Sequence, residues 1–180
     1  MVRPKDLKDG EPYNVQTHYH GDRVTPEHRN DGVANAIAND LRRNKTVYVL
    51  PEADNADNGQ ASYGGKFNQR DLTRDALLAS GLDPGLARNK IVSGHSRGGT
   101  PLKQAFDTNT MDANRIKLLD IPSNGGSTAR SLQAWRARGN NARVTFEDGV
   151  YGSNWRNIPG VEFIPGNGDH MDAVRKGLTR

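Results

Sequence analysis

Short apolar runs alternate with amphipathic stretches along the chain, and this alternation predicts strands followed by helices. The runs are rich in β-branched and aromatic residues and stop at glycine, proline or polar turn residues, which is typical of strands. The stretches between them place apolar residues three or four positions apart, as in Val33, Ile37 and Leu41, which is the spacing of one helix face. The expected strands are residues 13–19, 46–50, 90–93, 116–121, 143–146 and 161–164, and the expected helices are residues 33–41, 71–81, 100–106, 127–139 and 171–178.

The order of these elements indicates an α/β fold. Strands that alternate with helices are typical of a mostly parallel sheet with helices on both faces. We therefore expect a three-layer α/β sandwich with a mostly parallel central sheet, formed as a single domain over residues 1–180. Ligands of such sheets bind at the carboxyl ends of the strands. Residues 52–70 are rich in asparagine, aspartate and glycine and are expected to form a surface loop.

The composition indicates a thin hydrophobic core and excludes several kinds of site. Apolar residues make up 33% of the chain, and the mean hydropathy is −0.83. The 25 basic and 21 acidic residues are interspersed, and no aromatic–basic pattern occurs, which argues against a nucleic-acid partner. The sequence contains no cysteine, so disulfides, thiol catalysis and cysteine metal sites are excluded.

The sequence predicts neither a membrane span nor a secretory signal. No stretch approaches the roughly 20 apolar residues that a membrane-spanning helix needs. The first six residues, Met-Val-Arg-Pro-Lys-Asp, lack the apolar segment of a signal peptide. By default, these observations predict a cytoplasmic location.

The most informative motif is Gly-His-Ser-Arg-Gly at residues 94–98, which matches the G-x-S-x-G pattern of a nucleophile elbow. In such an elbow the serine occupies a tight turn between a strand and a helix, so that its hydroxyl is exposed. Glycines flank the serine because a Cβ at those positions would collide with backbone across the turn. The predicted strand before the motif and the predicted helix after it supply the required context. Ser96 is therefore a candidate nucleophile, although a glycine-rich turn with a capping serine would show the same residues.

A serine nucleophile needs a base and an acid, and in an elbow fold these follow it in the order acid, then histidine. His170 is the single histidine after Ser96 and lies in a glycine-rich segment behind the last predicted strand. Asp120 and Asp148 both follow strands of the carboxyl-terminal half and both could hold the histidine. We prefer Asp120, because the Asp148-Gly149 pair is often only a turn.

Two further carboxylates are weaker candidates for the same role. Glu147 ends the strand that precedes Asp148. Asp169 is adjacent to His170, and in most loop geometries its side chain would face away from the imidazole.

The oxyanion of acyl transfer needs two backbone donors. The N–H of Arg97, directly after the nucleophile, is expected to be the first. The segment His20-Gly21-Asp22 follows the first predicted strand, so the second donor is expected to be the N–H of Gly21 or Asp22. His95 and the Arg97 side chain flank the serine and either shape the site or fill the turn.

The His20-Gly21 segment, the elbow at residues 94–98 and the late Gly168-Asp169-His170 segment together resemble the α/β-hydrolase superfamily of serine hydrolases. The resemblance implies hydrolysis of an ester, thioester or amide through an acyl-enzyme, without a metal or organic cofactor. It implies a small-molecule acyl substrate. The chain is short for this superfamily, so the first strands of a full-size fold are reduced or absent. No insertion large enough for a substantial lid follows the elbow helix.

Two alternatives use other features of the sequence. His18 and His20 would lie on one face of a strand and, with Asp22 and His170, could hold a metal ion of a metal-dependent hydrolase. Arg23 stands where a related metal-binding motif would place another histidine, which weakens this alternative. The other alternative is a non-catalytic binding module on a hydrolase fold.

Overall fold

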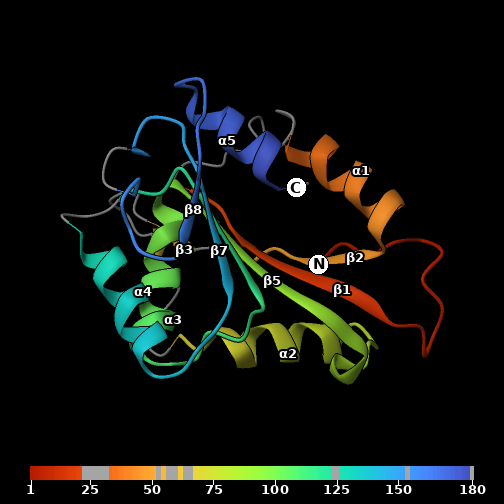
Figure 1. Ribbon diagram of the computed structural model, residues 1–180. Helices are drawn as coiled ribbons and strands as arrows, with labels where there is room; N and C mark the ends of the chain where they lie inside the picture. Colours follow the sequence, from red (N-terminus) through yellow and green to blue (C-terminus); the bar gives the residue numbers. More distant parts are fainter. Residues whose placement is uncertain are drawn as a thin grey trace.

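A computed structural model describes residues 1–21, 33–51, 54–55, 61–62, 67–122, 126–152 and 155–178. Its centre is a six-stranded sheet in which all neighbouring strands run parallel, in the order β2-β1-β5-β6-β7-β8 (Figure 1). The strands are β1 (Tyr13–Tyr19), β2 (Thr46–Val49), β5 (Ala87–His95), β6 (Arg115–Leu119), β7 (Arg143–Glu147) and β8 (Val161–Ile164).

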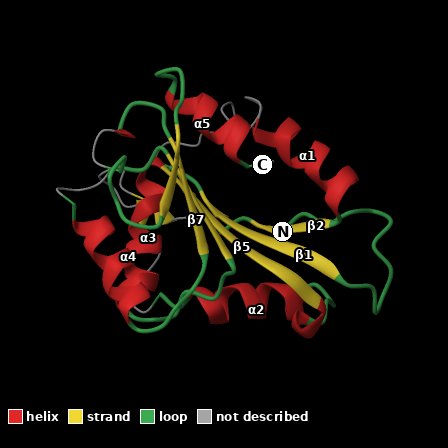
Figure 2. Ribbon diagram, viewed as in Figure 1, coloured by secondary structure: helices red, strands yellow, loops and turns green. Residues whose placement is uncertain are grey.

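Helices cover both faces of this sheet, which confirms the expected three-layer α/β architecture. They are α1 (Val33–Asn44), α2 (Gln69–Ala79), α3 (Gly99–Asp107), α4 (Ser127–Ala137) and α5 (His170–Gly177). Helices α1 and α5 lie on one face, and α2, α3 and α4 lie on the other (Figure 2). No helix in the described part of the chain is long and apolar enough to cross a membrane.

Several element boundaries differ from the predicted ones. The predicted strand 116–121 ends at Leu119, because Asp120 turns into the left-handed region with φ of +45°. Helix α2 begins at Gln69 rather than residue 71, since the side chain of Asn68 caps it by accepting a hydrogen bond from the amide of Asp71. Residues 52–70, predicted to be a loop, contain the two short strands β3 (Asp54–Asn55) and β4 (Ala61–Ser62), which pair with each other.

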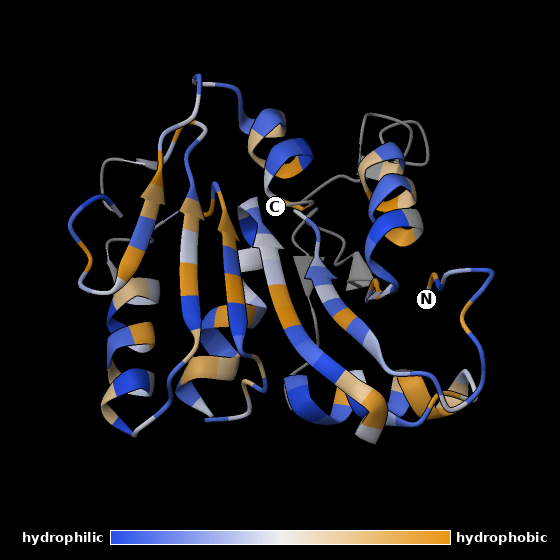
Figure 3. Cartoon of the chain, turned by 45° about the vertical axis from the view of Figure 1, so that its right-hand side comes forward, coloured by the Kyte–Doolittle hydropathy of each residue, from blue (hydrophilic) through white to orange (hydrophobic). Residues whose placement is uncertain are grey.

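The two faces of the sheet differ in chemistry. Parallel strands covered on both sides usually read as continuous apolar runs, but these strands alternate between apolar and polar residues (Figure 3). Toward α2, α3 and α4 the sheet buries the apolar side chains of Tyr19, Val92, Ile116, Leu118, Val144 and Phe146. The alternate positions, on the face toward α1 and α5, include the buried polar side chains of Gln16, His18, Ser93, Lys117, Thr145 and Glu147.

Candidate active site

The strand–turn–helix geometry around Ser96 is that of a nucleophile elbow. Strand β5 ends at His95, a short 3₁₀ turn η3 (Ser96–Gly98) follows, and α3 begins at Gly99. Ser96 has φ of +52°, a left-handed conformation that non-glycine residues rarely adopt. Its side chain is half-buried at the carboxyl edge of the sheet.

Both elbow glycines are required by close backbone approaches. A Cβ on Gly94 would lie 2.6 Å from the carbonyl oxygen of Gly98, across the turn. A Cβ on Gly98 would lie 2.2 Å from the carbonyl oxygen of Tyr19, at the end of the neighbouring strand β1. The elbow is therefore packed directly against the segment that follows β1.

That segment brings Gly21 next to the candidate nucleophile. A Cβ on Gly21 would lie 2.8 Å from the Cβ of Ser96 and 3.4 Å from its Oγ, so only glycine fits here without a shift. The Nδ1 of His20 donates a hydrogen bond of 2.7 Å to the carbonyl oxygen of Gly21. Asp22, the other expected oxyanion donor, lies outside the described residues.

His170 and Asp120 meet although they are far apart in the sequence. His170 is the first residue of α5, and Asp120 follows β6 directly. The Nδ1 of His170 donates a hydrogen bond of 2.5 Å to Oδ2 of Asp120. The histidine side chain is 32% exposed and the aspartate side chain is fully buried. The hydrogen bond between them therefore runs from the interior of the protein to its surface.

Backbone amides hold the Asp120 carboxylate in its ionised form. The amide of Val150 donates to both carboxylate oxygens, and the amide of Tyr151 donates to Oδ1 at 2.9 Å. Burial alone would raise the pKa of Asp120. The hydrogen bonds from His170, Tyr151, Val150 and Gly149 outweigh that effect and hold the pKa below its ordinary value.

The segment after β7 forms this amide cradle, and the sequence signal for it is the Asp148-Gly149 pair. A Cβ on Gly149 would lie 2.3 Å from Oδ2 of Asp120, so a glycine is needed for the chain to pass over the carboxylate. The Asp-Gly pair thus marks the turn that holds Asp120. Sequence reasoning did not identify the amides of Val150 and Tyr151, because backbone donors leave no side-chain pattern.

The other candidate acids have different neighbours. The carboxylate of Asp148 lies over Gly152, where an added Cβ would come within 2.0 Å of its Oδ1. Glu147 is buried, and its Cγ would lie 2.8 Å from a Cβ placed on Gly177, in the last turn of α5. Asp169 caps α5 by accepting from the amide of Met171 and pairs with Arg175 at 2.9 Å.

Two rings contact the imidazole of His170. The His95 ring lies with its centroid 4.3 Å away, and burial is the main reason that the pKa of His95 falls to about 3. His95 is therefore uncharged at neutral pH and adds no positive charge beside His170. The Tyr151 ring meets the imidazole edge-on at 5.6 Å, and 42% of this residue is exposed. Arg97, directly after Ser96, is also exposed.

The described residues do not assemble the alternative metal site. No group of three potential ligands that could hold a metal ion occurs within the described ranges, and Asp22 lies outside them. His18 is buried, with its Nδ1 hydrogen-bonded to the Oγ of Ser93 at 2.9 Å. Burial is the main reason that its pKa falls to about 3.

Comparison with known proteins identifies the fold. No protein-family model and no curated protein matches this sequence. Among solved structures, fluorophosphonate-binding serine hydrolase F of Staphylococcus aureus is 15% identical, with a TM-score of 0.62 over 97% of this chain and 85% of that chain. A serine hydrolase homologue from Coxiella burnetii is 17% identical, with a TM-score of 0.61 over 99% of this chain and 88% of that chain. Est1E from Butyrivibrio proteoclasticus, solved with ferulic acid, is 14% identical, with a TM-score of 0.60 over 99% of this chain and 90% of that chain. The chain therefore has the α/β-hydrolase fold.

Proposed function

We propose that this protein is a serine hydrolase that cleaves an ester or a related acyl bond of a small molecule through an acyl-enzyme on Ser96. The observation that carries the proposal is the hydrogen bond from His170 to the buried Asp120, at the same edge of the sheet as the left-handed Ser96. A carboxylate held in this way orients the imidazole and stabilises the imidazolium that forms when the ring takes a proton. The neighbours with the same fold, which are serine hydrolases and esterases, support the same class of reaction.

The chemistry follows from the assignment of each group. Because Nδ1 of His170 donates to Asp120, Nε2 is the basic nitrogen and takes the hydroxyl proton of Ser96 as Oγ attacks the acyl carbon. The tetrahedral oxyanion accepts hydrogen bonds from the amide of Arg97 and from the amide of Gly21 or Asp22. His170 then gives its proton to the leaving alcohol, and the C–O bond to that alcohol breaks. In the second half, water attacks the acyl carbon as His170 takes one of its protons. The bond from the acyl carbon to Oγ of Ser96 then breaks, His170 returns the proton to Oγ, and the acid product leaves.

The nucleophile is tested with a fluorophosphonate probe, which forms a covalent bond with an activated serine. We expect the wild-type protein to be labelled and Ser96→Ala to lose both the labelling and about 10³-fold or more in kcat on p-nitrophenyl acetate. Ser80→Ala, which removes a hydroxyl at the end of α2, is the matched control and should be labelled like wild type. Labelling that survives in Ser96→Ala would refute the assignment, and activity that EDTA abolishes would point to the metal-dependent alternative.

The acid is tested by comparing Asp120→Asn with Asp148→Asn. Asparagine at position 120 cannot carry the negative charge that stabilises the imidazolium, so we expect kcat on p-nitrophenyl acetate to fall by about 10³–10⁴-fold. The Asp148 carboxylate lies over Gly152, so Asp148→Asn should keep kcat within about threefold of wild type. The opposite order of effects would show that Asp148 is the acid.

A further inference from the structure

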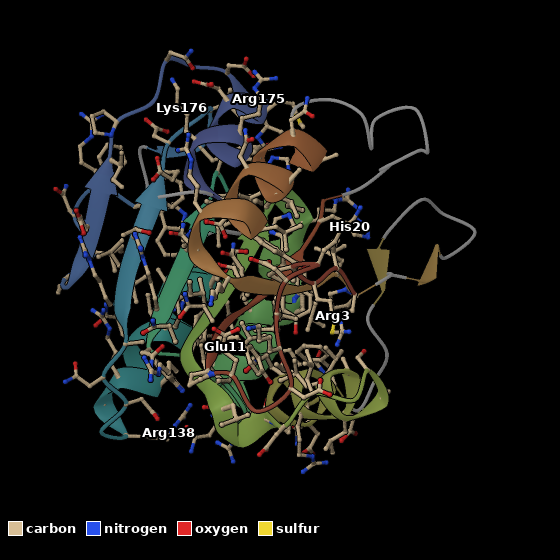
Figure 4. The ribbon with its side chains drawn as sticks, turned by 90° about the vertical axis from the view of Figure 1, so that its right-hand side faces the viewer. Arg3, Glu11, His20, Arg138, Arg175 and Lys176 are labelled. Carbon is tan, nitrogen blue, oxygen red and sulfur yellow. The ribbon has the colours of Figure 1, made fainter. Side chains whose placement is uncertain are left out.

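A second concave site lies at the other end of the sheet from Ser96. It is a cavity of about 400 Å³ at the amino ends of the five strands β1, β2, β5, β6 and β7, on the face that α1 and α5 cover. Figure 4 shows the separation along β1, where His20 follows the strand at the Ser96 end and Glu11 precedes it at the cavity end. Small-molecule sites have volumes of about 300–1,000 Å³. Its charged lining residues are Asp40, Arg115, Lys117 and Arg143.

Three cations converge in this cavity. Arg115 of β6 stands directly opposite Arg143 of β7 in the sheet register, and Lys117 lies two residues further along β6, on the same face. Like charges placed opposite one another across strands are destabilising. Lys117 is 2% exposed, so its ammonium group has almost no contact with solvent.

Each carboxylate near these cations already has a contact of its own. Asp40 accepts from the hydroxyl of Tyr48 at 2.8 Å and from the side-chain Nδ2 of Asn44 at 2.6 Å. Glu162 is paired at 2.7 Å with Arg143, which is itself one of the three cations, and its charge also acts on Arg115. Glu147, the third carboxylate near these cations, packs against α5 at Gly177.

The cations themselves retain unused hydrogen-bonding capacity. The Nε of Arg115 is buried and has no hydrogen-bond partner in the described part of the protein. The Nζ of Lys117 donates one hydrogen bond, at 2.8 Å, to the backbone carbonyl of Leu178. An ammonium group has three donors, so Lys117 can also bind a ligand oxygen.

We propose that this cavity binds a small molecule through an oxyanion group, either a phosphate or a carboxylate, held by Arg115 and Lys117. A guanidinium fork matches the geometry of both groups, and a bound anion would offset the repulsion between Arg115 and Arg143. Asn14, Asn89 and Asn114 also line the cavity and make it polar. The site shares no residue with the proposed hydrolase site, so neither proposal depends on the other.

The binding is tested by isothermal titration calorimetry with inorganic phosphate and with citrate, at an ionic strength kept constant with NaCl. We expect saturable binding of one or both anions by the wild-type protein, and phosphate and citrate distinguish the two kinds of oxyanion. Arg115→Gln should weaken the Kd at least tenfold. Arg74→Gln removes the same charge from α2, on the opposite face, and should leave the Kd within twofold, as should Ser96→Ala.

Amide shifts in ¹H–¹⁵N NMR spectra of the wild-type protein give a second readout that does not depend on a variant that folds. Anion binding should shift the resonances of Gln16, Arg115 and Lys117 and leave those of residues 94–98 in place. The proposal is overturned if neither anion binds saturably, if Arg115→Gln binds as tightly as wild type, or if the shifts map to the elbow. The Ser96→Ala labelling result would stand in each case.

Discussion

The two faces of the central sheet share the same strands but bury different groups. Toward α2, α3 and α4 the strands pack apolar side chains such as Leu118 and Phe146 against helices, with no exposure to solvent. Toward α1 and α5 the alternate positions are mostly polar and include the buried Lys117, although Tyr48 and Leu119 pack there in a smaller apolar cluster. The larger part of the apolar core therefore lies on one face, and the other face combines a smaller apolar cluster with hydrogen-bonded polar groups.

The polar face is stabilised by its own hydrogen bonds. The Oγ of Ser93 accepts from Nε2 of Gln16 at 3.0 Å and is hydrogen-bonded to Nδ1 of His18 at 2.9 Å. Buried polar groups are tolerated when they have such partners and are costly when they lack them. Arg115 is the contrasting case on this face, since its buried Nε has no partner in the described part of the chain. Polar groups with partners, such as the Ser93 hydroxyl, stabilise the fold, whereas the Nε of Arg115 is available to a ligand.

The largest expected difference in stability between the two faces is at Phe146. Its ring is fully buried and stacks between Trp155 and Phe163, so Phe146→Ala should lower the free energy of unfolding by about 3–5 kcal/mol. The matched control is Thr145→Ala, which changes the adjacent buried residue on the polar face and should cost about 1 kcal/mol. Urea denaturation followed by circular dichroism measures both. Equal losses would show that the two faces contribute equally to stability.

A smaller effect, of opposite sign, is expected at Lys117. Burial, followed by the charge of Arg115, lowers its pKa from 10.5 to about 8, although Asp40 and Glu147 act in the other direction. This shift corresponds to about 3 kcal/mol of destabilisation at pH 7. Lys117→Met keeps the bulk but loses the hydrogen bond to Leu178, so we expect a net stabilisation of about 2 kcal/mol in anion-free buffer.

The pH dependence of this stabilisation tests its cause. Between pH 8 and 10.5 the folded protein has lost the Lys117 proton while the unfolded chain retains it, so the wild-type protein gains stability as pH rises. The advantage of Lys117→Met, measured by urea denaturation at pH 7, 8, 9 and 10, should therefore decrease across this range. A constant difference would mean that packing rather than charge explains the variant.

The smallest effect is expected for Tyr48→Phe. The Tyr48 hydroxyl donates a buried hydrogen bond to Oδ2 of Asp40, and removing it leaves that oxygen without this donor. We expect a loss of about 1–2 kcal/mol in the same urea experiment. A matched change on the apolar side is Tyr13→Phe, whose hydroxyl donates to the backbone carbonyl of Asp83 and whose loss should cost less than 1 kcal/mol. If Tyr13→Phe lowered the free energy of unfolding as much as Tyr48→Phe, the buried hydrogen bond on the polar face would contribute no more than the one on the apolar side.

Much of the fold and of the candidate site could be predicted from the sequence, because these features have local signals. Apolar spacing predicted the six main strands and the five helices, and the glycines around Ser96 predicted the elbow. The short strands β3 and β4 were not predicted, because two-residue strands leave no periodicity. The Asp148-Gly149 turn pair favoured Asp120 over Asp148 as the acid, but both residues follow strands, and local sequence does not show which carboxylate reaches His170.

The sequence by itself determined the order of strands and helices, the elbow at Ser96 and His170 as the one downstream histidine. Tertiary structure alone decided which carboxylate lies against His170, since the two residues of that hydrogen bond are 50 positions apart. It also decided that Arg115, Lys117 and Arg143 meet in one cavity, because the register between β6 and β7 brings them onto one face. Local patterns determine backbone conformation, whereas contacts between distant residues depend on how the strands are ordered and aligned.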